Sequence, residues 1–114
     1  MRVFKTGETP WGSEEVLWQN DGVTVKIISV RAGHRLSLQS HARRDERWFA
    51  MTAGGTFQVG DVVLPATAGM HGEVPRGAKH RISAGTADFH VLEIALGPFD
   101  QNDIVRYEDD YGRV

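Results

Sequence analysis

Four side chains suited to binding a metal stand in two short motifs of this 114-residue chain. Gln39, His41 and Glu46 lie close together, and His80 follows in the second motif. Two imidazoles, one carboxylate and one amide oxygen form a donor set that suits a first-row divalent metal ion. The sequence therefore predicts a site for one divalent metal, with zinc as first choice and manganese, nickel or iron as alternatives.

The geometry of β-strands explains how these four side chains would meet. Gln39 and His41 are two residues apart, so on a strand they point to the same face. The polar stretch that follows can reverse the chain and bring Glu46 beside them, while a tight turn at 75–77 delivers His80. Two alternatives stay open: the histidines are ordinary polar residues at strand ends, or Gln39 only hydrogen-bonds to a ligand.

The elements that must position this site are short strands. Glycines punctuate β-branched runs throughout the chain, and no segment before residue 100 shows a helical period. This pattern predicts an all-β sandwich or barrel of eight or nine strands, while the charged tail 99–114 could hold a short helix or strand. The runs that we expect to be strands are 23–30, 35–41, 47–52, 56–59, 62–64, 70–74, 80–83 and 88–96.

Length and composition limit the classes of protein to which the chain can belong. We expect residues 1–114 to form a single domain, and 40% hydrophobic residues argue against disorder. A net charge of −2 argues against a nucleic-acid partner. No apolar run approaches the roughly 20 residues that span a membrane, and the N-terminus lacks the pattern of a signal peptide. Together with the absence of cysteine, this makes a cytoplasmic location the expectation.

A small open barrel leaves unpaired edge strands, which proteins commonly cover or pair. Three tryptophans add apolar area that an interface could use. We therefore expect a homodimer.

The two motifs resemble the two conserved motifs of the cupin superfamily. Gly69, Pro75, Gly77 and His80 match the second motif, and the first differs in having Gln39 where a histidine is usual. This resemblance implies a cupin-type β-barrel, also described as a double-stranded β-helix or jelly roll.

A narrower resemblance covers nearly the whole chain. It is similar to the C-terminal domain of type II mannose-6-phosphate isomerases, which usually follows a mannose-1-phosphate guanylyltransferase domain. The resemblance implies a metal set of Gln39, His41, Glu46 and His80, and conversion of mannose 6-phosphate to fructose 6-phosphate through an enediol, as part of carbohydrate metabolism. The segments that carry it are 10–13, 36–41, 44–48, 75–81 and 103–113.

Basic residues gather around these motifs and favour an anionic ligand. Arginine grips phosphate oxygens with two parallel hydrogen bonds. We expect Arg44, which matches the family position, and Lys79, which precedes a ligand, to hold the phosphate of a sugar-phosphate substrate. Arg106 and Arg113 lie in the family-like tail, which we expect to fold back over the site. The basic residues within the motifs are Arg35, Arg43, Arg44, Arg47, Arg76, Lys79 and Arg81.

Departures from the family pattern keep other functions open. Ala42 and Arg43 stand where the family has two further histidines, and Arg47 replaces another. We do not expect GDP-mannose synthesis from this chain alone, because it holds no glycine-rich nucleotide loop. One alternative is an Fe(II)-dependent oxygenase using two histidines and one carboxylate. The other is a non-enzymatic module that binds a metal or a sugar.

Overall fold

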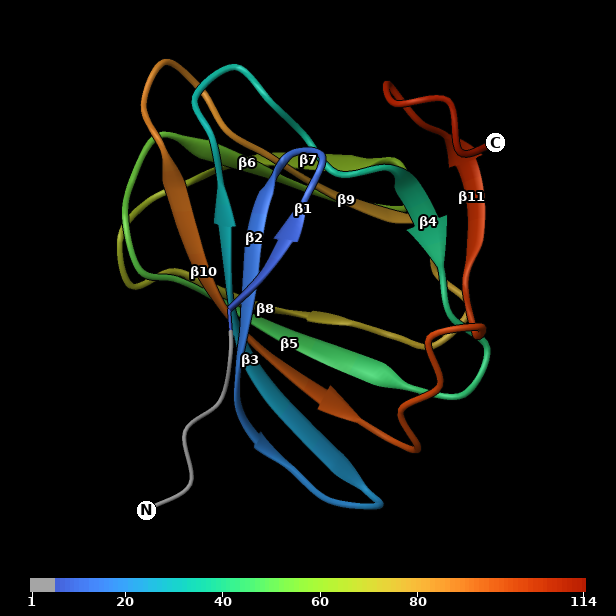
Figure 1. Ribbon diagram of the computed structural model, residues 1–114. Coiled ribbons are helices and arrows are strands. Elements are labelled where there is room, and N and C mark those ends of the chain that lie inside the picture. The colour runs from blue at the N-terminus through green and yellow to red at the C-terminus, as the bar shows by residue number, and fades with distance from the viewer. Residues whose placement is uncertain (1–5) are drawn as a thin grey trace.

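A computed structural model describes residues 6–114, which fold into two antiparallel sheets and contain no helix. Figure 1 shows the sheets facing each other, with β6, β7 and β9 along the top and β5 and β8 along the bottom. The first sheet has the order β1 (Thr6–Thr9), β2 (Gly12–Gln19), β3 (Val23–Val30), β10 (Phe89–Leu96), β5 (Asp45–Ala50) and β8 (His71–Val74). The second has the order β11 (Val105–Glu108), β4 (Leu38–Ser40), β9 (His80–Ser83), β6 (Gly55–Val59) and β7 (Val62–Ala66).

The space between the sheets is apolar at one end and polar at the other. Along β3 every second residue is buried, and the inward positions change from Thr24 and Lys26 to Ile28 and Val30. Its neighbour β10 changes in the same way, because Phe89 lies opposite Val30 in the ladder. The apolar end forms the hydrophobic core, and the polar end holds buried polar and charged side chains. The core residues are Trp11, Ile28, Val30, Leu36, Trp48, Ala50, Phe57, Ala66, Val74, Ile82, Phe89 and Val91.

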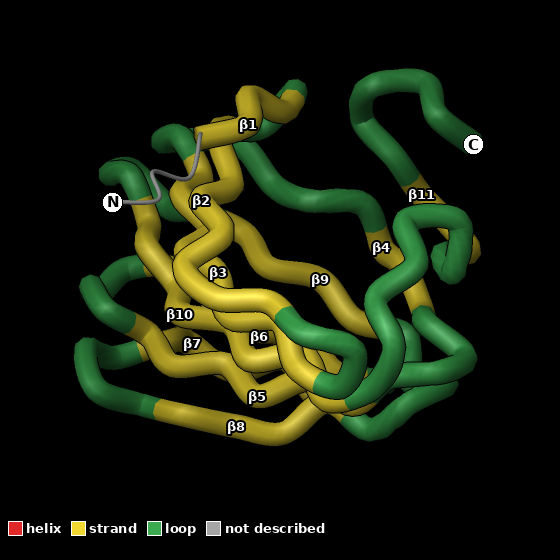
Figure 2. Tube along the Cα trace, turned by 60° about the horizontal axis from the view of Figure 1, so that its bottom comes forward, coloured by secondary structure: helices red, strands yellow, loops and turns green. Residues whose placement is uncertain are grey.

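The C-terminal tail closes the polar end. Strand β11 pairs with β4, and Figure 2 shows the connection from β10 running alongside these two strands. Asp103 in this connection accepts hydrogen bonds from the backbone amides of Ala42 and Arg43. Tyr111, further along, donates to the carbonyl of Arg35. The tail is therefore tied to the loop that carries His41.

The predicted all-β architecture is confirmed, and the strands at 23–30 and 80–83 match the expected bounds. The tail holds a strand, β11, which was one of its two predicted states. Strands β1 and β2 were not predicted. The sequence of β2, Gly-Ser-Glu-Glu-Val-Leu-Trp-Gln, lies near the sheet edge and is half-buried or exposed along its whole length, so no apolar alternation marks it. Within residues 6–114, no helix is long and apolar enough to cross a membrane.

Candidate metal centre

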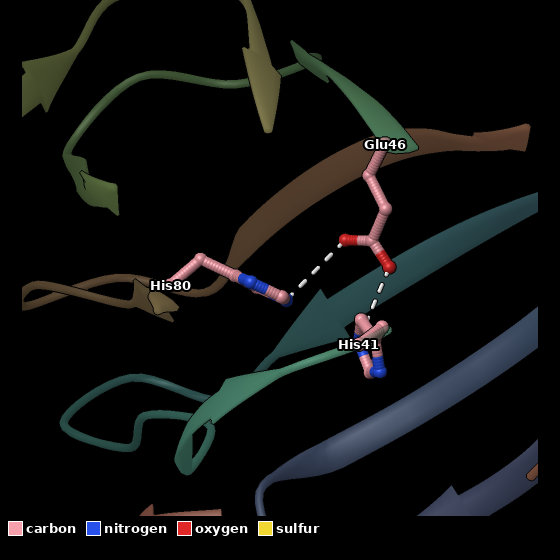
Figure 3. A group of neighbouring side chains, drawn as sticks. All are labelled: His41, Glu46 and His80. Carbon is pink, nitrogen blue, oxygen red and sulfur yellow. Dashed lines mark ion pairs between the residues drawn. The ribbon is translucent and has the colours of Figure 1, made fainter. Parts of the chain in front are cut away.

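His41, Glu46 and His80 converge from separate parts of the chain at the polar end of the two sheets. His41 directly follows β4, Glu46 lies on β5 and His80 begins β9. One donor atom from each lies within 4.8 Å of the other two, and all three side chains are buried. Figure 3 shows the Glu46 carboxylate between the two rings, with Oε2 3.3 Å from Nε2 of His41 and Oε1 3.5 Å from Nε2 of His80. The predicted grouping of these three residues is present.

Backbone carbonyls fix the orientation of both imidazoles. Nδ1 of His41 lies 2.7 Å from the carbonyl oxygen of Asp103, and Nδ1 of His80 lies 2.9 Å from that of Ala78. A carbonyl oxygen can only accept, so each Nδ1 carries the proton and each Nε2 keeps its lone pair. This is the arrangement by which proteins orient metal-binding histidines.

The turn predicted at 75–77 delivers His80 as expected. The amide of Ala78 donates to the carbonyl of Pro75, which closes a β-turn, and Gly77 has a φ of 83°. Glycine suits this position because a positive φ strains other residues. The amide of Gly77 also donates to the carbonyl of His41 over 2.7 Å. The turn is thereby attached to the other imidazole's backbone.

The donor set and its surroundings fit a divalent cation. Nε2 of His80 is buried and has no hydrogen-bond partner among the described residues. Such an orphaned acceptor is costly unless something binds it. The surrounding cluster holds three carboxylates, Glu14, Glu46 and Glu93, against two cations, Lys26 and Arg44. A bound cation would satisfy the orphaned nitrogen and favour the ionised form of Glu46.

Glu46 is buried among charged side chains. Burial raises the pKa of its carboxyl above the ordinary value, and the nearby Glu93 raises it further. The guanidinium of Arg44 opposes this rise, with Nε 3.1 Å from Oε2 of Glu46. Trp48 donates its indole N–H to Oε1 over 3.1 Å. These contacts hold the carboxylate in place between the imidazoles.

A buried ion pair beside the metal ligands was not predicted. Lys26 on β3 and Glu93 on β10 are direct partners in the antiparallel ladder, with Nζ 3.3 Å from Oε2. Burial alone would raise the pKa of the Glu93 carboxyl, but Lys26, Glu46 and Arg44 together hold that pKa below the ordinary value. The ammonium also lies 3.1 Å from Oε1 of Glu14.

A cavity of about 200 Å³ opens beside the ligands. Basic, acidic and aromatic side chains share its wall, and the tail contributes Phe99, Asp103, Arg106 and Arg113. This confirms that the tail folds over the site. Other lining residues include Glu14, Lys26, Gln39, His41, Arg44 and Glu93.

Of the other three predicted site residues, Gln39 and Arg44 line the cavity and Lys79 does not. Gln39 lines the cavity and lies opposite His80 in the β4–β9 ladder, with its amide oxygen 2.7 Å from Oγ of Ser37. Arg44 also lines the cavity, whereas Lys79 is exposed and lies over the ring of Tyr107, 4.2 Å from its centroid. Lys79 precedes His80 on the strand, and adjacent residues of a strand face opposite ways.

Most other basic residues of the motifs have structural partners. Arg35 pairs with Asp110 and Arg76 with Asp45, while Arg81 donates to the carbonyl of Leu36. Among the seven, only Arg44 lines the cavity.

We expect the metal-free protein to lose stability as the pH falls from 6.5 towards 4. Burial, followed by the nearby Arg44 guanidinium, lowers the pKa of His41 from 6.5 to about 4. Between these pH values His41 is protonated in the unfolded chain but not in the folded chain, so the free energy of unfolding decreases as the pH falls. The raised pKa of Glu46 acts in the opposite direction above pH 4.5.

Chemical denaturation in the presence of a chelator, compared between wild type and His41→Gln, isolates the contribution of His41. The variant should show a smaller fall over this pH interval. Equal slopes for the two proteins would contradict the assignment.

The sequence matches a known protein family and several relatives. The family described as "Mannose-6-phosphate isomerase C-terminal" matches residues 1–109. The chain is 35% identical over 106 residues to the xanthan biosynthesis protein XanB of Xanthomonas campestris, covering 91% of this chain and 23% of the relative. It is 33% identical over 119 residues to a mannose-1-phosphate guanylyltransferase of Escherichia coli K12, covering 99% and 24%. The chain thus spans about a quarter of the length of these relatives.

Solved structures with the same fold are more distant in sequence. CapF, a capsular polysaccharide assembling protein of Staphylococcus aureus, superposes with a TM-score of 0.82 at 16% identity, covering 95% of this chain and 35% of that one. Pac13 of Streptomyces, a nucleoside dehydratase, gives a TM-score of 0.77 at 17% identity, covering 93% and 86%. At this identity the likeness supports the fold alone, a cupin-like β-barrel.

Proposed function

This chain belongs to the family of mannose-6-phosphate isomerase C-terminal domains, and we propose that it is a metal-dependent sugar-phosphate isomerase. The proposed reaction interconverts mannose 6-phosphate and fructose 6-phosphate. The observation that carries the proposal is the buried grouping of His41, Glu46 and His80, of which His41 also lines a cavity with basic residues in its wall. Gln39 is the proposed fourth ligand. Zinc, manganese, nickel and iron all suit this set.

The residues around the cavity match what the reaction requires. Isomerisation moves a proton between C2 and C1 of the open-chain sugar, so it needs a proton acceptor and stabilisation of the negative charge on the enediol oxygens. A divalent metal, if held by His41, Glu46 and His80, would supply that stabilisation as a Lewis acid. Glu14 and Glu93 add carboxylates to the cavity wall beyond the ligand set. Glu93 is ionised, because Lys26, Glu46 and Arg44 together lower its pKa.

The tail offers a place for the substrate's phosphate. Arg106 lies opposite Gln39 in the β11–β4 ladder, and both line the cavity. Its Nε atom is buried and without a hydrogen-bond partner among the described residues. An anionic oxygen would satisfy this donor. Arg113 and Arg44 line the same wall, where they are paired with Asp109 and Glu46.

A coupled assay for fructose 6-phosphate, with each candidate metal added in turn, tests the enzyme directly. Turnover of mannose 6-phosphate that disappears with a chelator would support the proposal. Binding of mannose 6-phosphate without turnover would favour the alternative of a non-enzymatic binding module. Uptake of oxygen by the Fe(II)-loaded protein would instead favour the oxygenase.

We expect Arg106→Met to weaken binding of mannose 6-phosphate by about 1.5–3 kcal/mol, the range for a hydrogen bond to a charged group. Calorimetry measures this, with unphosphorylated mannose as the reference ligand. Arg43→Met is the matched control, because Arg43 is exposed and does not line the cavity. Lys79→Met examines one of the two residues, Arg44 and Lys79, that the sequence predicted to hold the phosphate. An equal affinity of wild type for both sugars would refute the phosphate site.

We also propose that the protein is a homodimer in the cytoplasm. Edge strand β7 supports the dimer, because Val62, Val63 and Leu64 are all exposed on it. Apolar residues on both faces of an edge strand are uncommon unless something covers them. Sedimentation at micromolar concentration should show a dimer that Val63→Lys weakens. A wild-type monomer would contradict this expectation.

A further inference from the structure

The guanidinium of Arg44 occupies the position between two of the metal ligands. Its Nη2 lies 3.1 Å from Nε2 of His41, and its Nε lies 3.1 Å from Oε2 of Glu46. The side chain is only 6% exposed, so this contact is part of the packed interior. The ring of Phe99 lies against it, 5.1 Å from Cζ to the centroid.

The hydrogen bond to His41 uses a lone pair that a metal also needs. Nδ1 of His41 carries the ring proton, since it faces the carbonyl oxygen of Asp103. A neutral imidazole protonated at Nδ1 has one lone pair in the ring plane, on Nε2. That lone pair can accept from Arg44 or bind a metal, but not both. Glu46 is different, because a carboxylate has several acceptor positions and can keep Arg44 while binding a metal.

We propose that Arg44 is an oxyanion-binding residue that becomes available only when a metal displaces it from His41. The inference rests on the proposed metal site. Metal binding leaves the Nη2 donor of Arg44 without its acceptor, while Nε remains beside Glu46. A buried donor that loses its partner is costly, so an incoming anionic oxygen gains affinity by replacing that partner. Metal and oxyanion are therefore coupled ligands, and each strengthens the binding of the other.

The surroundings of Arg44 favour an oxyanion as this replacement. Arg106 lines the same cavity, and its Nε is buried without a hydrogen-bond partner among the described residues, whereas Arg113 in the same wall is bound to Asp109. The two aspartates of the wall are engaged elsewhere, because Asp103 accepts from the amides of Ala42 and Arg43, and Asp100 accepts from that of Asn102. The ligand class is a carboxylate, a phosphate or an enediolate oxygen.

The experiment measures two affinities in the same variants by calorimetry, with zinc as the metal and sulfate as the oxyanion. Arg44→Met should bind zinc about tenfold more tightly than wild type, because the competing hydrogen bond is gone. The zinc-loaded variant should bind sulfate about ten- to a hundredfold more weakly, because the charged donor is gone. Sulfate should also bind zinc-loaded wild type more tightly than the metal-free protein.

Opposite effects on the two affinities distinguish this role from a structural one, which would weaken both. Arg43→Met is the control and should leave both affinities unchanged. Zinc affinity in Arg44→Met equal to or below that of wild type, or unchanged sulfate affinity, overturns the inference. Equal zinc binding by wild type and His41→Ala/His80→Ala instead overturns the proposed metal site itself.

Nitrogen NMR of wild type provides a test that needs no variant to fold. Saturation with zinc should shift the His41 ring resonances and the guanidinium resonances of Arg44 together. Guanidinium resonances that stay unchanged at saturation would also overturn the inference.

Discussion

The double variant His41→Ala/His80→Ala should lose divalent metal almost completely. Removing the partners that orient a metal ligand commonly costs about 10–100-fold in affinity, and removing two ligands should cost at least roughly 100-fold. Only Glu46 would remain of the three buried donors that the structure brings together. Elemental analysis of the purified proteins, followed by zinc titration, measures the loss.

Two other histidines provide the matched control. His34 and His71 lie outside the cavity wall, and His71 is exposed and stacks on Phe49. The variant His34→Ala/His71→Ala should keep the metal content of wild type. Gln39→Ala should fall between the two, because a neutral amide oxygen is a weak ligand. Equal metal content in all four proteins would rule out the site.

Breaking the Lys26–Glu93 pair should have the largest effect on stability. Glu93→Leu leaves a buried ammonium that only Glu14 still accompanies, and removing one partner of a buried pair typically costs about 3–5 kcal/mol. Glu93 is 4% exposed, so water cannot replace it. Thermal and urea unfolding in the presence of a chelator measure the change without a contribution from metal.

The double variant Lys26→Met/Glu93→Leu should recover much of this loss, because neither charge remains to be solvated. The exposed pair of Arg47 and Glu73, separated by 4.0 Å, is the control. Glu73→Leu should change stability by no more than about 1 kcal/mol. A loss for Glu93→Leu no larger than for Glu73→Leu would show that the buried pair is unimportant.

The contribution of the Lys26–Glu93 pair to stability should depend on pH. It should be complete above pH 4.5 and decline below it, because the pKa of Glu93 is lowered by folding.

The grouping of His41, Glu46 and His80 was accessible from the sequence because strand parity and turn chemistry act locally. Gln39 and His41 share a face through their spacing, and Pro75 and Gly77 identify the turn that delivers His80. The convergence of Glu46 with the histidines followed from chain reversal. These inferences require no knowledge of which strands pair, so they survive errors in topology.

The rest of the site depends on pairing between distant strands. Lys26 and Glu93 are far apart in sequence and meet only through the β3–β10 ladder. Within 23–30 the apolar residues Val23, Val25 and Ile27 suggest the opposite inward face from the one observed, since Lys26 faces inward. The role of Asp103 was hidden for a different reason, because its carbonyl orients His41 and any residue type has a carbonyl.

The bond between Asp103 and His41 has a consequence for the order in which the protein becomes functional. A ribosome makes His41, Glu46 and His80 well before it makes residue 103, whose carbonyl fixes the His41 ring. During synthesis, all the metal-binding side chains are therefore present while one of them is still free to rotate. Metal loading at full affinity should begin only after β11 has docked on β4. Metal capture would thus report that residue 103 has been made and positioned, and nascent chains stalled before residue 103 should bind metal weakly.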